Sequence, residues 1–147
     1  MTQLVNSTLR RNIWKNFDTF LDSITWTSTT PTIIQSYNDS NNTFPMIIFP
    51  SAKINISSKS LDGSIKERVG NLIFEIHSKD PLQLDQTTDD IDRSLTADTP
   101  LEAEGMEFLG DNYWDESEPA TWFMNEKEKV HMKVITLSFN ASNLKAS

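Results

Sequence analysis

Apolar residues recur at helical spacing near the start of the chain. Leu9, Ile13, Phe17, Leu21 and Ile24 each follow the previous one by three or four positions. This repeat places them on one face of a helix, while the charged residues between them fall on the other face. The pattern predicts an N-terminal amphipathic helix of about four to five turns that lies on an apolar layer.

Further along the chain, apolar residues alternate with polar ones, which is the period of a half-buried strand. The alternation is longest in 67–77 and 130–140. The short apolar run 44–49, with prolines at positions 45 and 50, predicts a strand that is buried on both faces or forms a sheet edge. Strands are thus expected at 32–34, 44–49, 52–57, 67–77, 121–124 and 130–140.

The apolar residues of the 130–140 strand change sides partway along. They occupy the even positions from 130 to 134 and the odd positions from 135 to 139, so a regular strand cannot place all of them on one face. Either a bulge near Val134 and Ile135 shifts the register, or the two halves cover different partners. We favour the second interpretation, with one half in the core and the other covered by a helix on the opposite face.

A second helix is expected to start at Asp80 and Pro81, because an Asp-Pro pair often opens a helix. Its apolar line would be formed by Leu84, Thr88, Ile91 and Leu95, and its outward side by Asp85, Asp89, Asp90, Asp92 and Arg93. A shorter helix is predicted at 100–109, and 110–119 reads as an acidic, aromatic loop or irregular strand.

These elements predict an α+β fold in which a mostly antiparallel sheet is flanked by the N-terminal amphipathic helix and the second helix. The chain has 147 residues, a length that suits a single domain spanning 1–147. Its longest apolar runs, 46–49 and 122–124, are much shorter than the ~20 residues of a membrane-spanning helix. No membrane partner is therefore expected.

The charge of the chain is unevenly distributed. Its formal net charge is −8, which argues against a protein that grips nucleic acid through phosphate contacts. The segment 80–128 alone carries −13 and the remainder +5. One face of the molecule should therefore be strongly acidic and another mildly basic, an arrangement that suits the complementary surfaces of a head-to-tail ring.

The motifs of catalysis are missing from the chain. It has no cysteine, no Gly-rich phosphate loop, and no acidic residue two positions before a lysine, as restriction-type nucleases require. Asp90 and Asp92 lie two apart in a predicted helix, so a solvated helix face is a simpler interpretation than a metal site. His77 and His131 lie in predicted strands, where satisfied or surface histidines are commoner than ligands. We expect no enzymatic activity, no cofactor and no metal.

The order of the segments carries a resemblance to a known family. The amphipathic helix is followed by Phe-Pro-x-Ile-Ile at 44–48, Lys-Ser-Leu-Asp-Gly at 59–63, a strand ending Phe-Glu-Ile-His-Ser at 74–78, a helix through 91–95 and a closing strand at 131–139. In this order the segments resemble the tail terminator, or tail completion, proteins of long-tailed bacteriophages. The resemblance covers roughly residues 10–139, although 110–119 does not align with the family pattern.

The resemblance implies a ring-forming α+β subunit of the virion. Such a protein forms a hexameric ring on the last ring of the tail tube, stops tube growth and gives the neck of the head a docking surface. The implied partners are further copies of the chain, the tail-tube protein on one side and a neck or head-completion protein on the other. The implied location is the head-proximal end of the tail, reached from the host cytoplasm during assembly.

The resemblance and the uneven charge together lead us to expect roles for particular residues. In such rings the loop between the two middle strands reaches toward a neighbour, which here is 58–66. The residues expected at subunit contacts are Leu61, Ile65 and Lys66. Trp114, in the acidic aromatic segment, is expected either at a subunit contact or in the core. An acidic channel would repel DNA phosphates and let the genome pass without binding. The residues expected to face this lumen are Asp85, Asp89 and Asp92.

Two alternatives stay open. The chain could be another neck component, such as a head–tail connector, or a tail-tube subunit that polymerises without limit. It could instead be a small ligand-binding or enzymatic α+β domain that uses its tryptophans and carboxylates, in which case a concave pocket with perturbed carboxyl pKa values is expected. Six-fold rings, long tubes or a ligand-binding monomer would distinguish these classes.

Overall fold

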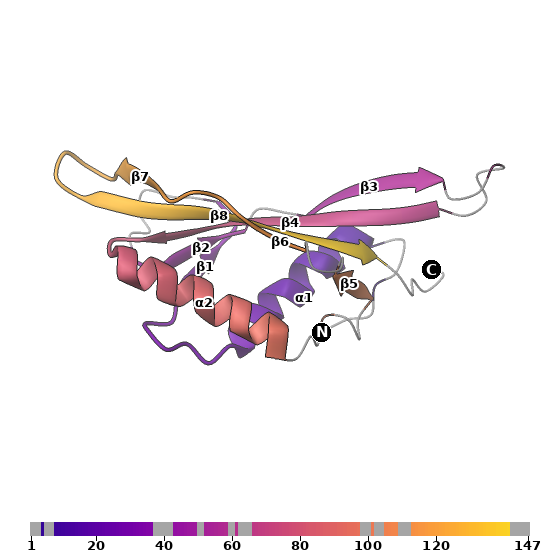
Figure 1. The fold of residues 1–147 in the computed structure, drawn as a ribbon, viewed down its shortest axis with the longest axis horizontal. Helices are drawn as coiled ribbons and strands as arrows, with labels where there is room; N and C mark the ends of the chain where they lie inside the picture. The colour runs from indigo at the N-terminus through magenta and orange to yellow at the C-terminus, as the bar shows by residue number, and fades with distance from the viewer. Residues whose placement is uncertain are drawn as a thin grey trace.

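The computed structural model describes residues 4, 8–36, 43–49, 52–58, 61, 66–97, 101, 105–108 and 113–141 (Figure 1). They form two helices and an eight-stranded, mostly antiparallel sheet, which confirms the predicted α+β class. The elements in chain order are α1 (Leu9–Ser23), β1 (Thr32–Ile34), β2 (Met46–Ile48), β3 (Ala52–Ser58), β4 (Lys66–Ser78), α2 (Pro81–Ala97), β5 (Met106–Phe108), β6 (Trp114–Glu116), β7 (Ala120–Phe123) and β8 (Lys129–Ala141).

Two long strands, β4 and β8, form the centre of the sheet. They pair antiparallel without interruption from Val69 opposite Asn140 to Ser78 opposite His131. On the other side of β4, β3 pairs with its first half and β2 with its last residues. Along the outer side of β8, β5, β6 and β7 pair one after another. β1 pairs with β2 in parallel and is the exception to the antiparallel pattern.

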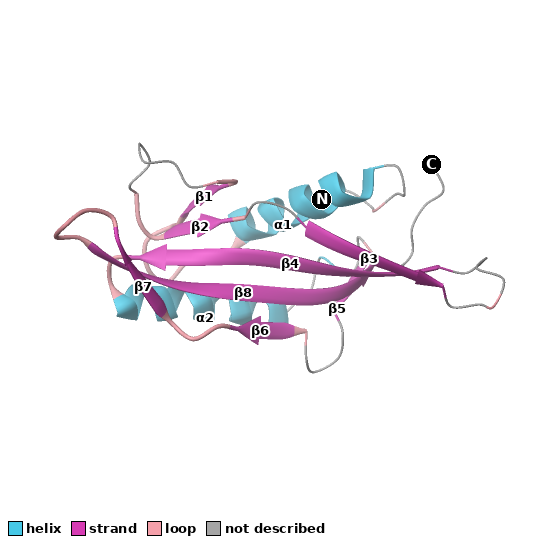
Figure 2. Cartoon of the chain, turned by 90° about the horizontal axis from the view of Figure 1, so that it is seen from above, coloured by secondary structure: helices cyan, strands magenta, loops and turns pink. Residues whose placement is uncertain are grey.

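Both helices lie on the same face of the sheet (Figure 1). This face contributes Leu72, Phe74 and Ile76 of β4, which are fully buried. The predicted stripe of α1 packs against them, because Ile13, Phe17 and the rest of the stripe are buried. Seen from above, α1 lies along the β1, β2 and β3 side of the sheet and α2 lies beneath β8 and β6 (Figure 2). None of the helices in the described part of the chain is long and apolar enough to cross a membrane.

The predicted start and inner face of α2 are confirmed. The Asp80 carboxylate accepts a hydrogen bond from the Leu82 backbone N–H at 3.0 Å, and the predicted inner line at 84, 88, 91 and 95 is buried. The outward prediction for Asp90 is wrong, since this residue is 1% exposed. Its carboxylate accepts hydrogen bonds from the Thr27 backbone N–H at 2.9 Å and from the Thr27 hydroxyl, and it pairs with Arg93. The turn after α1, which is distant in sequence, therefore binds a carboxylate that the helical repeat alone places in solvent.

The change of sides along β8 has a simple structural basis. Because the β4–β8 register has no interruption, the strand contains no bulge at Val134 and Ile135, and its two halves do face different partners. The odd positions from 135 onward pack under the helices. The expected helix on the opposite face is wrong for the described residues, where both helices cover one face. On the open face, Val130 is buried alongside Met46, His77 and Trp122.

The helix predicted at 100–109 is wrong over its second half. Met106–Phe108 is the strand β5, which pairs with Asn140 and its neighbours on β8. Gly105 has a φ of 98°, a backbone conformation that a right-handed helix excludes and that glycine adopts at low cost. This glycine turns the chain into the sheet. Residues 100, 102–104 and 109 of this prediction lie outside the described part of the chain.

Candidate functional site

A hairpin arm formed by β3 and β4 extends past the helices at one end of the molecule (Figures 1 and 2). The two strands pair from Ala52 opposite Leu72 out to Ser58 opposite Lys66. Beyond the base of the arm, Ile56 is 55% exposed, and Leu61 at its tip is fully exposed. Single exposed aliphatic side chains are common on protein surfaces, but these two lie on a projecting arm, where another protein can reach them.

The predicted contact residues do not all lie on this arm. Leu61 is at its tip, and Lys66 is the first residue of β4, with its side chain outside the described part. Ile65 also lies outside the described residues. Trp114 lies on β6, across β8 from the arm, where it is half-buried against the core. The structure thus separates Trp114 from Leu61 and from the backbone of Lys66, and a role for any of the four in subunit contact stays a prediction.

A second hairpin, formed by β7 and β8, projects at the other end of the molecule (Figure 1). Phe123, at the end of β7, is 63% exposed. The hairpin is fixed to the sheet by Trp122, whose indole N–H donates to His77 Nδ1 at 2.9 Å. His77 Nε2 lies 2.9 Å from a Glu75 carboxylate oxygen, so both ring nitrogens of this buried histidine have partners. The interpretation of His77 as a satisfied strand histidine is confirmed.

Ile56 and Phe123 are surface residues that sequence reasoning missed. The alternation of Ile54 and Ile56 with polar residues predicts a half-buried strand, and it does not reveal where the helix beneath that strand ends. Phe123 lies in a correctly predicted strand, but its side is set by the register of β7 on β8. Neither residue carries a local signal that separates an exposed position from a buried one.

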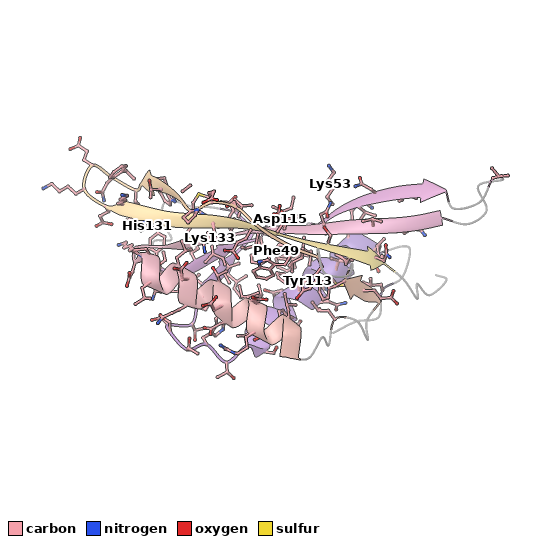
Figure 3. The ribbon with its side chains drawn as sticks, in the orientation of Figure 1. Phe49, Lys53, Tyr113, Asp115, His131 and Lys133 are labelled. Carbon is pink, nitrogen blue, oxygen red and sulfur yellow. The ribbon has the colours of Figure 1, made fainter. Side chains whose placement is uncertain are left out.

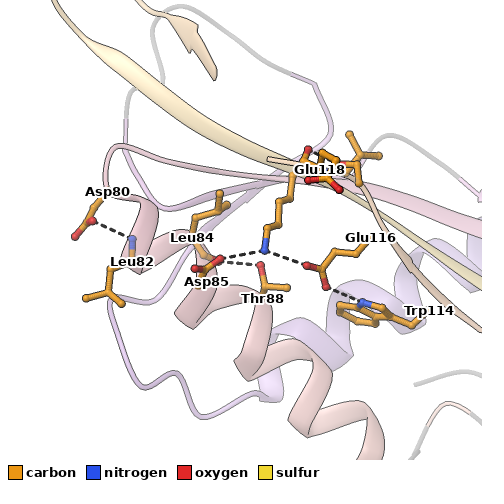
Figure 4. A network of polar contacts seen from close by, with 11 residues as sticks. Asp80, Leu82, Leu84, Asp85, Thr88, Trp114, Glu116 and Glu118 are labelled. Atoms are coloured by element: carbon orange, nitrogen blue, oxygen red, sulfur yellow. Dashed lines mark hydrogen bonds and ion pairs between the residues drawn. The ribbon is translucent and has the colours of Figure 1, made fainter. Parts of the chain in front are cut away.

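A buried lysine joins the helix layer to the outer side of the sheet. Lys133 is 8% exposed and lies on the face of β8 that points toward α2 (Figure 3). Its Nζ donates to Asp85 of α2 and to Glu116 of β6, both at 3.0 Å (Figure 4). The Trp114 indole N–H donates to the other oxygen of Glu116, also at 3.0 Å. These contacts place Asp85, Glu116 and Trp114 in one network.

The network changes the ionisation of its members. Burial alone would lower the pKa of Lys133, but its hydrogen bonds to Glu116 and Asp85 raise that pKa above its ordinary value. Burial alone would raise the pKa of Glu116, but the hydrogen bonds from Lys133 and Trp114 lower it. Both groups are therefore charged at neutral pH, and each stabilises the charge of the other.

The three aspartates predicted to face a channel lie on one side of α2. Asp85, Asp89 and Asp92 are exposed, and their spacing of four and three residues places them on the side next to β6. Asp85 is partly neutralised by Lys133. Burial, followed by the charges of Asp89 and Glu116, raises the pKa of Asp92. The structure brings these residues together, and their position relative to a channel stays a prediction.

Exposed basic residues lie on α1 and β3, which run along the other long side of the molecule (Figure 2). Arg10, Arg11 and Lys15 are exposed on α1, and Lys53 of β3 points away from the helices on the open face of the sheet (Figure 3). α1 is anchored at this side by Trp14, which stacks on Phe49 and donates its indole N–H to the Phe49 carbonyl at 2.9 Å. Among the described residues, exposed acidic side chains thus lie on α2 and β6 and exposed basic side chains on α1 and β3, elements on opposite long sides of the sheet (Figure 2).

Comparison with known proteins does not identify a relative. No protein-family model matches the chain, and no curated protein matches it in sequence. Within the described residues, no group of three or more histidines and carboxylates could hold a metal ion. The features that remain for functional interpretation are the two hairpins, their exposed apolar residues and the two oppositely charged sides.

Proposed function

We propose that this chain is a structural protein of a bacteriophage tail, a terminator-like subunit that assembles with further copies of itself into a ring. The ring has six subunits, sits at the head-proximal end of the tail tube and stops tube elongation. It offers a docking surface to the neck proteins of the head, and DNA passes through its centre without specific binding. This function has no catalytic step and needs no cofactor.

The observation that carries the proposal is the apolar hairpin arm. Ile56 and Leu61 expose large aliphatic side chains on a part of β3–β4 that the helices do not cover. Fully burying one such side chain stabilises a contact by roughly 1.5–3 kcal/mol. A neighbouring subunit that covers the arm gains this free energy. An arm of this kind lets each subunit reach the next one.

The shape of the subunit supports the same function. β4 and β8 have 13 residues each, and the hairpins that they form with β3 and β7 project at opposite ends. Contacts made through different surfaces of the same subunit are heterologous, and they close into a ring when the rotation between neighbours closes. A ring of such subunits needs no twofold symmetry between them.

The arm gives a direct test of the proposal. Sedimentation velocity of the wild-type protein is expected to show a single assembly of about six times the 16.8 kDa chain mass. Replacing Ile56 with Ser should raise the apparent dissociation constant about tenfold or more, because the lost apolar burial exceeds the ~1.4 kcal/mol of a tenfold change. Leu82→Ser is the matched control, since Leu82 is 63% exposed but lies on the first turn of α2.

The outcome also separates the alternatives. Unlimited polymerisation of the wild-type protein into tubes would indicate a tail-tube subunit. A wild-type chain that stays monomeric at all concentrations would contradict the ring. Equal effects of Ile56→Ser and Leu82→Ser would remove the arm from the proposed contact.

A further inference from the structure

The elements along the two long sides of the subunit carry exposed residues of opposite charge. The acidic edge is defined by residues of α2, β6 and the segment that follows β6, namely Asp85, Asp89, Asp92, Asp115, Glu116 and Glu118. The basic edge is defined by residues of α1, β3 and β4, namely Arg10, Arg11, Lys15, Lys53 and Arg68. In the view from above, α1 and α2 lie along opposite long sides of the sheet (Figure 2).

The counter-charges on each edge do not reverse its sign. The acidic edge contains Lys133 and Arg93, which pair with Asp85, Glu116 and the buried Asp90. Asp89 and Asp92 lie on the same exposed side of α2, where burial and then the charges of Asp89 and Glu116 raise the pKa of Asp92. The basic edge contains Asp18 and Asp22 in the second half of α1. The first half of that helix is basic.

We infer that neighbouring copies in the ring meet edge to edge, with the acidic edge of one copy against the basic edge of the next. This inference rests on the proposed function and adds the surfaces through which the ring closes. In Figure 2 the first half of α1 lies toward the hairpin arm, and Figure 1 shows that α2 runs toward the same end. A copy placed beside another in the same orientation therefore has Arg11 and Lys15 nearer to Asp89 and Asp92 than to Asp85.

Electrostatic complementarity of this kind selects the partner and the register of association. Because both edges belong to one chain, each copy offers one edge to each of its two neighbours, which gives a head-to-tail contact. The arrangement places Asp89 and Asp92 between subunits. It therefore competes with the prediction that these residues line the channel.

Two charge-reversal variants test the edges in the full-length chain. The first carries Arg11→Glu with Lys15→Glu, and the second carries Asp89→Lys with Asp92→Lys. All four positions are exposed, so each variant is expected to keep the thermal unfolding midpoint of the wild type within a few degrees. A variant with Thr29→Glu and Thr30→Glu is a control for added negative charge, because both residues are exposed in the turn between α1 and β1 and belong to neither edge.

Each edge variant alone should assemble at least about tenfold more weakly than the wild type, since its two edges then repel each other. An equimolar mixture of the two should regain the wild-type mass. The first variant has two acidic edges and the second has two basic edges, so the two can alternate around a ring with an even number of subunits. Rings that both edge variants form normally, or a mixture that stays dissociated, would overturn the inference and leave the proposed ring standing. A wild-type protein without any assembly would overturn the proposed function itself.

Discussion

Lys133 places a charged side chain on the helix-facing, otherwise apolar side of β8. It shares the helix-facing side of β8 with Ile135, Leu137 and Phe139, yet it carries a charge. A buried ammonium is tolerated only when partners replace its hydration, and Asp85 and Glu116 do so from two different elements. The lysine thereby connects α2 to β6 at the rim of the core.

The first prediction concerns the pH dependence of this network. The pKa of Glu116 is lowered in the folded state, so its contribution to stability is present above the unfolded value and is lost as the pH falls through the folded value. The pKa of Lys133 is raised, so its contribution is lost only when the pH rises through the folded value in the alkaline range. At neutral pH, Glu116→Gln should cost about 0.5–1 kcal/mol, because the carboxylate is partly exposed.

Urea unfolding of the wild type and of Glu116→Gln at several pH values measures the difference between their free energies of unfolding. It should shrink on acidification, because the wild-type carboxylate is then protonated as well. Glu118→Gln is the control, since Glu118 is a neighbouring exposed glutamate. A stability gap that stays constant down to acidic pH would contradict the role of the Glu116 charge.

The second prediction concerns Gly70, which lies opposite Phe139 in the β4–β8 ladder. A Cβ at this position would lie 2.7 Å from Cε2 of the Phe139 ring, which is itself fully buried. Gly70→Ala should therefore destabilise the fold by about 1–3 kcal/mol through overpacking. In a double-mutant cycle, Phe139→Leu should relieve part of this cost, so the two unfolding free energies should not add. Full additivity would show that the ring and the new methyl group do not compete.

At the scale of elements, α2 is held in place by contacts that its apolar helical repeat does not predict. Asp90 does not lie on the exposed acidic side of the helix. Its carboxylate accepts hydrogen bonds from the Thr27 backbone N–H and hydroxyl, in the turn that follows α1. One side chain thus joins the end of α1 to the middle of α2. The neighbouring Asp89 is exposed.

This contrast gives the third prediction. Asp90→Ala should lower the free energy of unfolding by about 1–3 kcal/mol, because the hydrogen bonds to a buried carboxylate and its ion pair with Arg93 are lost. Asp89→Ala, one position away, should change it by no more than about 0.5 kcal/mol. Chemical denaturation of both variants measures the difference. Equal effects would show that burial at position 90 does not matter.

The elements that the sequence predicts correctly are those with a long local repeat. The stripe of α1, the inner line of α2 and the alternation of β4 and β8 all follow from short-range spacing. The remaining elements depend on strand pairing, which a local repeat does not contain. Met106–Phe108 forms a strand because it pairs with the outer side of β8 and because Gly105 adopts a positive φ. The candidate site divides in the same way. Leu61 lies in a recognisable turn segment, whereas Ile56 and Phe123 are exposed because of where other elements end.

At the scale of the whole molecule, three properties act together in the proposed ring. The hairpins extend the subunit at both ends, the helices cover only one face of the sheet, and the two long sides carry opposite charges. Each property suits a chain that is completed by copies of itself. The open face, the exposed Ile56 and Phe123 and the acidic row of α2 are then surfaces of an assembly.

The fourth prediction follows from the charged edges. If they meet in the ring, raising the salt concentration from about 0.05 to 0.5 M should weaken assembly of the wild type, because the Debye length falls severalfold. Sedimentation velocity across this range should show dissociation at the high-salt end at low protein concentration. The thermal unfolding midpoint of the subunit should change much less. Assembly that strengthens or stays constant with salt would indicate a contact carried by apolar burial alone.

The most direct test of the proposed function is electron microscopy of the purified wild-type protein in negative stain at low salt. The proposed function predicts closed rings with six-fold class averages and an open centre, and no growth into longer tubes as the protein concentration rises. Particles that remain single subunits, or that stack into tubes without limit, would contradict it.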